Sequence, residues 1–281
     1  MQEVVENIPL EKLKPFPNHP FKIREDEAMM ETVESVKLFG VLQPAIVRPT
    51  KDGEYEILSG HRRKRACELA GRKTMPVIVR ELSDDAAVIF MVDSNLQREN
   101  ILPSERAAAY KMKLDAMKRQ GMRTDLTSAQ VAPKLSTERI GEQEGISKDT
   151  IKKFIRLTEL QPELQQMVDE KKIAFTPAVE LSYLKPDEQR MLIDTIESEK
   201  STPSLSQAQR MKKLSQSGAL NDDVMLSIMT ELKKHEKNEI RLSSDILEKY
   251  FPKNYTPQKM QEVIIKLLES WQRKRQMNHE R

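Results

Sequence analysis

The sequence of 281 residues is poor in glycine, cysteine, long apolar runs and net charge. With only 8 glycines and many Lys, Glu, Gln, Leu and Met residues, its composition favours helix. Its one cysteine, Cys67, excludes an internal disulfide and fits a reducing compartment. No apolar run reaches the roughly 18 residues of a membrane span, and the N-terminus lacks the pattern of a signal peptide. We therefore expect a cytoplasmic protein.

The formal net charge is only +3, from 47 Lys and Arg against 44 Asp and Glu. This value neither indicates nor excludes a nucleic-acid partner, so the placement of the charges must decide. The four histidines, at positions 19, 61, 235 and 279, lack the spacing of metal ligands, and a zinc site is not expected. No Ser-His-Asp or Cys-His arrangement can be recognised, so no catalytic residue is assigned.

Residues 1–102 mix strand and helix patterns, which predicts an α+β domain. Four segments rich in β-branched residues are expected to form strands, at 3–10, 44–49, 54–60 and 75–82. Three segments with helical patterns lie between or after them, at 26–39, 61–70 and 84–95.

From Pro103 onward the strand pattern disappears, and residues 103–198 are expected to form an all-helical domain. Its first helix is predicted from Ser104 to Gln120, with Gly121 as its stop. The composition of EKSTPSLS predicts a linker region, which we set at 199–220.

Residues 221–281 are then expected to form a helical C-terminal region. Its last helix begins with Thr256-Pro257, a favourable N-cap and first-turn pair. The apolar face of this helix, from Met260 to Trp271, could pair two chains or pack within its own domain.

The segment 139–157, RIGEQEGISKDTIKKFIRL, has the spacing of a helix-turn-helix. Gly141 is the small residue where the two helices cross, and Gly145 is the turn residue. Isoleucines and a phenylalanine supply the shared core. An ordinary helical hairpin with a solvated polar face is the alternative, but the spacing favours DNA binding.

The second helix of this motif would place its N-terminal residues on base edges and its basic side chains on phosphates. The residues left to solvent or DNA are Ser147, Lys148, Asp149, Thr150, Lys152, Lys153 and Arg156.

A second candidate site lies at LSGHRRKRACE, where a strand ends at Ser59 and a helix begins near His61. Backbone N–H groups at a helix N-terminus attract anions, and Arg62 and Arg63 add positive charge. Gly60 allows close approach of the backbone. The pattern indicates a cradle for nucleotide phosphates, with a basic surface helix as the alternative.

Two further elements carry hydrogen-bonding side chains. DSNLQREN at 93–100 ends an apolar helix; its Asn and Gln could bind sugar or base edges, and Asn or Asp could hold magnesium. The alternative is a polar helix C-terminus that binds nothing. In GVLQPAIVR, at 40–48, the amide of Gln43 could reach a ligand at the strand entry.

Together, and in this order, these motifs resemble the ParB family of chromosome and plasmid partition proteins. The resemblance starts at IPLEKLKPFPNHPF, continues through GVLQPAIVR, YEILSGHRRKRACELAG and NLQRENILPSERAAAY to the helix-turn-helix, and covers about residues 7–195. It implies a ParB/sulfiredoxin-like N-terminal fold. It also implies CTP with Mg²⁺ as ligand, a palindromic centromere-like site on double-stranded DNA, and a homodimer that nucleotide closes into a sliding clamp.

The resemblance also assigns the nucleotide-binding residues. The phosphate-holding element maps to Gly60, His61, Arg62 and Arg63, and the Gln-Pro element maps to Gln43. The remaining element maps to Ser94, Asn95, Gln97 and Arg98, with Asn95 as the candidate magnesium ligand.

The sequence departs from the family pattern at three positions. Ser94 replaces an acidic residue associated with hydrolysis, so at most weak CTPase activity is expected. His61 stands where many members have Glu, and Phe21 where the family usually has Arg. The N-terminus also lacks the basic tail through which many members stimulate a ParA-type ATPase, so this partner is a weaker expectation than DNA.

We therefore predict a nucleoid-associated, CTP-dependent DNA clamp that acts in segregation of a plasmid, mobile element or chromosome. A ParB-like transcription regulator or nucleoid-occlusion factor would share every motif, so it stays open as the alternative. The third alternative is an enzyme that uses the nucleotide for hydrolysis or phosphotransfer.

Overall fold

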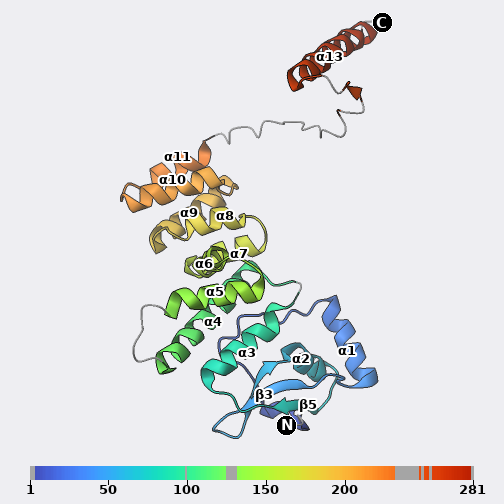
Figure 1. Ribbon diagram of the computed structural model, residues 1–281, viewed down its shortest axis with the longest axis vertical. Helices are drawn as coiled ribbons and strands as arrows, with labels where there is room; N and C mark the ends of the chain where they lie inside the picture. The colour runs from blue at the N-terminus through green and yellow to red at the C-terminus, as the bar shows by residue number, and fades with distance from the viewer. Residues whose placement is uncertain are drawn as a thin grey trace. The chain divides into compact units, whose positions relative to one another are not determined.

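The computed structural model describes residues 4–98, 100–124, 132–231, 247, 250–252 and 255–279. The chain divides into two units, Met1–Glu231 and Leu232–Arg281, which are described separately (Figure 1). Among the described residues, none of the helices has the length and apolar character needed to cross a membrane.

The first unit begins with a five-stranded mixed sheet in the order β1-β5-β3-β4-β2. The pairs β1/β5 and β3/β4 are antiparallel, whereas β5/β3 and β4/β2 are parallel. The strands are β1 (Val5–Pro9), β2 (Leu13–Pro15), β3 (Ala45–Pro49), β4 (Tyr55–Ser59) and β5 (Thr74–Val79), and the 3-10 turn η1 (Leu10–Lys12) joins the first two.

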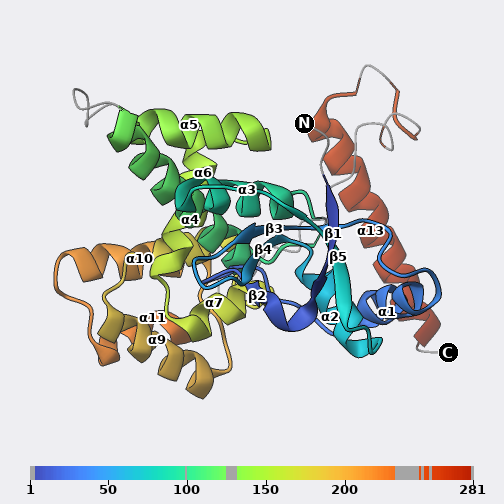
Figure 2. The ribbon, with the colours of Figure 1, turned by 90° about the horizontal axis from the view of Figure 1, so that it is seen from below.

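Side chains that alternate along the strands supply two cores, one on each face of the sheet. Ala45 and Val47 face the core formed with helices α1 (Glu27–Phe39) and α2 (His61–Leu69). The neighbouring Ile46 packs against the other core, beneath α3 (Asp84–Leu96). Figure 2 shows α3 on the opposite side of the sheet from α1 and α2.

The core beneath α3 continues into the helix-turn-helix without a break. Helix α4 (Pro103–Thr124) packs along α3, and α5 (Ala132–Glu144) and α6 (Lys148–Arg156) pack on α4. Buried residues from the sheet, α3, α4, α5 and α6 belong to one cluster, which includes Leu58, Met91, Tyr110, Ile140 and Ile151. The α/β part and the helix-turn-helix are thus held together by shared apolar burial.

A further core is built by short helices that follow α6. They are η2 (Leu157–Glu159), α7 (Pro162–Asp169), α8 (Phe175–Leu181), α9 (Pro186–Glu199), α10 (Leu205–Gln216) and α11 (Asp222–Thr230). Helix α10 lies within residues 199–220, which the sequence assigns to a linker. Its Ala208 and Met211 are fully buried, and Ser204 caps it, so most of this range is packed helix and not linker.

In the second unit the described helix is α13 (Pro257–His279). Thr256 accepts a hydrogen bond from the N–H of Lys259 through its hydroxyl, as the predicted N-cap does. Leu267, Leu268 and Trp271, on the predicted apolar face, are 62%, 58% and 58% exposed. Met260, Val263 and Ile264 on the same face are half-buried, so the described residues cover this face only in part.

The predicted fold class, an α+β domain followed by helical regions, is confirmed. Besides the linker at 199–220, one local expectation is wrong and one strand was missed. Helix α4 does not stop at Gly121 but runs to Thr124, because a glycine weakens a helix by about 1 kcal/mol and does not forbid it. Strand β2, with three residues and a proline, was not predicted; it forms because β4 offers a parallel partner at the sheet edge.

Candidate functional site

The N-terminus of α2 is an open cradle of backbone N–H groups. Gly60 is its N-cap, with φ +114°, and contributes no side chain to cap the first amides. A Cβ at Gly60 would lie 2.6 Å from Cβ of Ala45, so no other residue fits between α2 and β3. The first amides of a helix lack intrahelical acceptors and attract anions, so this N-terminus can accept a negatively charged group.

Arg63 fixes the loop that faces this cradle. Its Nη1 donates to the carbonyl oxygens of Gln43 and Pro44, each at 2.7 Å. Burial lowers the pKa of the guanidinium from its ordinary value. The two predicted residues Arg63 and Gln43 therefore lie together. The contact between them runs from the Arg63 guanidinium to the Gln43 backbone carbonyl, and it positions the loop. The Gln43 side chain is exposed.

A cavity of about 480 Å³ lies beside the cradle. Its volume falls within the range typical of small-molecule sites. Three of the predicted nucleotide-binding residues line it, Arg62, Gln97 and Arg98. The other lining residues are Phe21, Lys22, Arg24, Asp26, Ala28, Asn100, Ile101 and Glu105.

Positive charge dominates this cavity. Burial, and then the charge of nearby Arg62, lower the pKa of Arg98, because two guanidinium groups repel. The guanidinium of Arg98 stacks 5.7 Å from the ring centroid of Phe21. Arg62 donates to Asp26 at 3.1 Å, and this contact lowers the pKa of the carboxyl. An incoming anion would meet Arg24, Arg62 and Arg98 together with Lys22, against the carboxylates of Asp26 and Glu105 among the lining residues.

His61 is placed behind the cradle and does not line the cavity. It is 3% exposed, and its Nε2 accepts a hydrogen bond from the N–H of Phe16 at 3.4 Å. Its ring lies 3.9 Å from that of His19, centroid to centroid. Burial, followed by the charge of His19, lowers the pKa of His61 to about 3. The imidazole is therefore neutral near pH 7 and acts as a packing group beneath the loop.

Asn95 differs most from its predicted role. It is 1% exposed, and its amide donates to the Met91 carbonyl at 2.7 Å and to the Ser94 hydroxyl at 3.3 Å. Asp93, two residues earlier, pairs with Lys113 of α4. Neither side chain lines the cavity, and the described residues contain no cluster of three metal-ligating side chains. The residues present thus do not fit a magnesium ion held by Asn95.

Apart from Phe21, the sequence did not single out the loop at 21–26, and it did not single out Glu105. Glu105 is 5% exposed, and its carboxylate accepts hydrogen bonds from the N–H groups of Lys22 at 2.9 Å and Leu102 at 3.1 Å. It therefore ties the cavity loop to the start of α4. The contact spans 83 residues, so no local pattern could have indicated it.

The helix-turn-helix has the geometry that its glycines predict. A Cβ on Gly141 would lie 2.6 Å from the carbonyl oxygen of Ile146, so only glycine allows this crossing. Gly145 has φ +67° in the turn. Ser147 caps α6, since its hydroxyl accepts from the N–H of Thr150 at 3.1 Å, and the two hydroxyls lie 2.9 Å apart.

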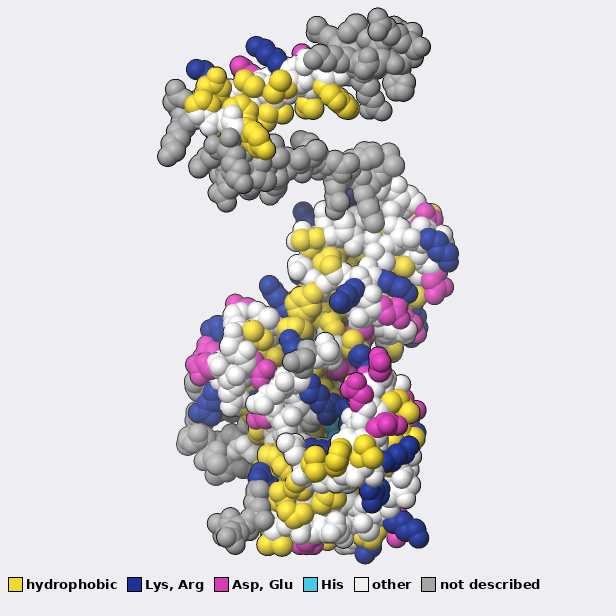
Figure 3. Space-filling view, turned by 90° about the vertical axis from the view of Figure 1, so that its right-hand side faces the viewer, with side chains coloured by type: hydrophobic (Ala, Val, Ile, Leu, Met, Phe, Trp, Pro, Cys, Tyr) yellow, Lys and Arg dark blue, Asp and Glu magenta, His cyan; other side chains and the backbone are white. Residues whose placement is uncertain are grey.

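The basic side chains of α6 differ in how they are engaged. Lys148 pairs with Glu138 at 2.7 Å, a contact that raises the lysine pKa, and Lys152 approaches Asp149 at 3.3 Å. Lys153 is exposed. These lysines remain accessible at the surface. On the face shown in Figure 3, basic and acidic side chains are interspersed, so no single charge dominates it.

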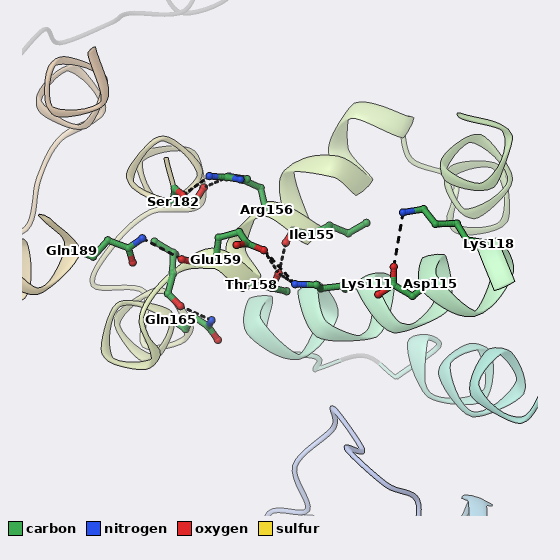
Figure 4. Close-up of polar contacts among 11 residues, drawn as sticks. Lys111, Asp115, Lys118, Ile155, Arg156, Thr158, Glu159, Gln165, Ser182 and Gln189 are labelled. Carbon is green, nitrogen blue, oxygen red and sulfur yellow. Dashed lines mark hydrogen bonds and ion pairs between the residues drawn. The ribbon is translucent and has the colours of Figure 1, made fainter. Parts of the chain in front are cut away.

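Arg156 is the exception on α6. Its Nη2 donates to the Ser182 carbonyl at 2.7 Å and its Nε to the Ser182 hydroxyl at 3.2 Å, so it reaches across to the end of α8 (Figure 4). The prediction that Arg156 is left to solvent or DNA is therefore incomplete, because the side chain is half-buried and held by a second helix.

Residues 1–96 match the family described as ParB N-terminal domain, and residues 99–217 match that described as ParB HTH domain. Stage 0 sporulation protein J of Bacillus subtilis is 40% identical over 169 residues, which are 60% of this chain and 54% of that protein. The chain spans about half to two thirds of the length of the curated relatives that it matches.

Two solved structures of a C-terminally truncated ParB, a chromosome-partitioning protein from Caulobacter crescentus, are also similar. The one complexed to the centromeric parS site is 27% identical, covers 74% of this chain and 98% of its own, and has a TM-score of 0.44. The one complexed with CTP-gamma-S is 29% identical, covers 67% and 96%, and has a TM-score of 0.32.

Proposed function

This chain belongs to the ParB family, whose N-terminal and HTH domains match residues 1–96 and 99–217, and from that premise we propose that it is a sequence-specific DNA-binding partition protein. One observation carries the proposal: the arginine-lined cavity and the helix-turn-helix share a single hydrophobic core through α3 and α4. A ligand in the cavity would therefore contact residues that pack on the same hydrophobic core as α6.

We propose that α6 enters the major groove of double-stranded DNA. Its capped N-terminus would bring Lys148, Asp149 and Thr150 to base edges, whereas Lys152 and Lys153 would meet phosphates. The Ser147 hydroxyl is already engaged by the Thr150 N–H, so its role is to cap α6. Because motifs of this kind bind as dimers to two half-sites, a homodimer would recognise a palindrome.

We propose CTP, the nucleotide that the family resemblance implies, as the ligand of the cavity. Its phosphates would lie at the α2 N-terminus, where Arg62 and Arg98 supply charge-assisted hydrogen bonds. The amides of Gln97 and Asn100 can donate to and accept from a base or sugar. Asn95 is buried, so we assign it to holding the end of α3.

We further propose that nucleotide binding closes the dimer around nucleoid DNA in segregation of a plasmid, mobile element or chromosome. The exposed apolar residues of α13 favour pairing of two chains. A ParA-type ATPase would be an additional partner. Mapping the bound sites across the genome separates this role from regulation, because a cluster beside a partition locus favours segregation and promoter-proximal sites favour regulation.

The nucleotide assignment is tested by calorimetric titration of CTP into the full chain and two matched variants. Arg62→Gln removes a charge that lines the cavity, and we expect at least tenfold weaker binding because charge-assisted hydrogen bonds contribute about 1.5–3 kcal/mol. Arg190→Gln removes the same charge from an exposed residue of α9 that pairs with Asp187 away from the cavity, and should leave CTP affinity unchanged. Equal losses in both variants, or none in either, would contradict the assignment.

A further inference from the structure

A cluster of cations and one aromatic ring lies beyond the helix-turn-helix, where α6, α8 and α10 meet. At its centre is Tyr183, which follows α8 and is 42% exposed. The guanidinium of Arg156 lies 4.3 Å from its ring centroid, and Nζ of Lys212 lies 3.7 Å from it. We call Arg156, Tyr183 and Lys212 the Tyr183 cluster. Its residues come from three separate helical segments, so the fold and not local sequence builds it.

The Tyr183 cluster is preorganised and carries more positive than negative charge. Ser182 holds the Arg156 guanidinium through Nε and Nη2 with uncharged oxygens, which neutralise nothing (Figure 4). Because a guanidinium has five N–H donors, these contacts leave its other N–H groups for a further acceptor. Lys212 pairs with Glu180 at 2.8 Å, which offsets one of the two cations. The geometry therefore suits one additional anion beside the ring.

The cluster continues the basic face of α6. Arg156 lies three residues after Lys153 and four after Lys152, so these side chains share a face of the helix, one turn apart. The N-terminal end of α6 carries the residues proposed for base contacts. A phosphate group next to the groove that α6 occupies would thus meet Lys153 first and the Tyr183 cluster next.

We propose that the Tyr183 cluster binds a backbone phosphate of the DNA held by α6, and so extends the DNA contact from the helix-turn-helix to α8 and α10. This inference rests on the proposed DNA-binding function and adds a contact that the helix-turn-helix alone does not supply. The phosphate would accept from Arg156 and Lys212, while the Tyr183 ring keeps both cations in place. Such a contact positions the protein on the duplex without reading a base.

The salt dependence of DNA affinity tests this contact. Each phosphate neutralised by a Lys or Arg contributes about 0.9 to the slope of log affinity against log salt concentration. Lys212→Gln should therefore lower the magnitude of the slope by about 1. Lys213→Gln is the matched control. Lys213 follows Lys212 on α10, but its side chain is exposed and points about 100° further round the helix. Its slope should equal that of the natural protein.

A third variant gives a change of opposite sign. Glu180→Gln removes the carboxylate that competes with DNA for Lys212, so DNA affinity at low salt should rise. If Lys212 and Glu180 only stabilise the packing of α8 on α10, both variants lower the urea unfolding midpoint and neither changes the slope. That result would overturn the proposal.

Substitution of Tyr183 gives an independent test of the cluster. Tyr183→Phe keeps the ring face and should keep the slope, whereas Tyr183→Leu removes the ring and should reduce it as Lys212→Gln does. An unchanged slope in Tyr183→Leu counts against the cluster. Failure of the natural protein to bind any DNA contradicts the proposed function itself. Binding by the natural protein with an unchanged Lys212→Gln slope contradicts only this inference.

Discussion

Nζ of Lys113 on α4 lies 2.5 Å from Oδ1 of Asp93 on α3 and also donates to the side-chain carbonyl of Gln143 on α5. The lysine side chain is 2% exposed, whereas that of Asp93 is 42% exposed. One ammonium group thus joins the helix that ends at the candidate cavity to the first helix of the helix-turn-helix. Water can therefore hydrate the Asp93 carboxylate if the pair is broken, but it cannot hydrate the Lys113 ammonium in the same way.

Asp93→Asn should destabilise the protein more than Lys113→Met. The first change leaves a buried ammonium without its counterion, at a cost of about 1–3 kcal/mol. The second removes the buried charge and lets the half-exposed Asp93 carboxylate hydrate, so we expect less than about 1.5 kcal/mol. Urea unfolding of both variants and of the double variant measures the order. A larger loss of unfolding free energy in Lys113→Met than in Asp93→Asn would show that the burial of Lys113 does not determine the cost of breaking the pair.

His61 should make stability depend on pH. Its pKa is about 3 in the folded protein against 6.5 as the ordinary value, so between these values the unfolded chain binds more protons. The free energy of unfolding should therefore fall as pH falls from 6.5 toward 3, by up to about 1.4 kcal/mol per pH unit for this group.

His61→Gln should flatten that dependence. Glutamine keeps an acceptor for the Phe16 N–H but does not titrate. Urea midpoints at several values between pH 7 and pH 4 provide the comparison. The pKa of His19 is also lowered, mainly by burial, so part of the slope should persist. A slope identical to that of the natural protein would exclude His61 as its source.

Gly60→Ala should disrupt the cradle much more than Gly53→Ala disrupts its turn. Both glycines have positive φ, +114° and +74°, so alanine is strained at either position. Only at Gly60 would the new Cβ approach within 2.6 Å of Ala45, whereas Gly53 has open space. We expect an extra cost of about 1–3 kcal/mol from this clash, together with loss of CTP binding. Thermal unfolding and calorimetric titration measure the two effects, and equal melting temperatures for the variants would exclude the clash.

Lys153→Gln should weaken DNA binding most at low salt and lower the salt slope by about 1. The lysine is exposed on α6, and its effect should be similar for cognate and unrelated sequences because it meets phosphate. Lys51→Gln, in the turn between β3 and β4, is the control with the same change of charge. Fluorescence anisotropy at several salt concentrations measures the slopes. An unchanged slope for Lys153→Gln would place this side chain away from the DNA.

Local patterns predicted most of the elements that position the site. The two glycines of the helix-turn-helix, Gly141 at the helix crossing and Gly145 in the turn, follow from sterics, and the cap by Ser147 follows from side-chain chemistry. Helical spacing could also have corrected the role of Asn95, which lies four residues after the buried Met91 and so on the same face.

Local sequence patterns could not predict the contacts between residues that lie far apart in the sequence. Arg156 is held by Ser182, 26 residues away, and the cavity loop is held by Glu105, 83 residues from its partner Lys22. The segment EKSTPSLS, which leads into α10, has the polar composition of a linker. Helix α10 itself is packed, because α8 and α11 bury its apolar face. These outcomes depend on tertiary packing, which overrides local preference.

Sequence-specific DNA binding is tested by selection of bound duplexes from a random DNA pool, with and without CTP. We expect the natural protein to enrich one palindromic sequence, because a dimer presents two copies of α6. We also expect CTP to change how the enriched DNA is retained, since the cavity and α6 share one core. A pool that stays random after selection, in either condition, would contradict sequence-specific DNA binding by this protein.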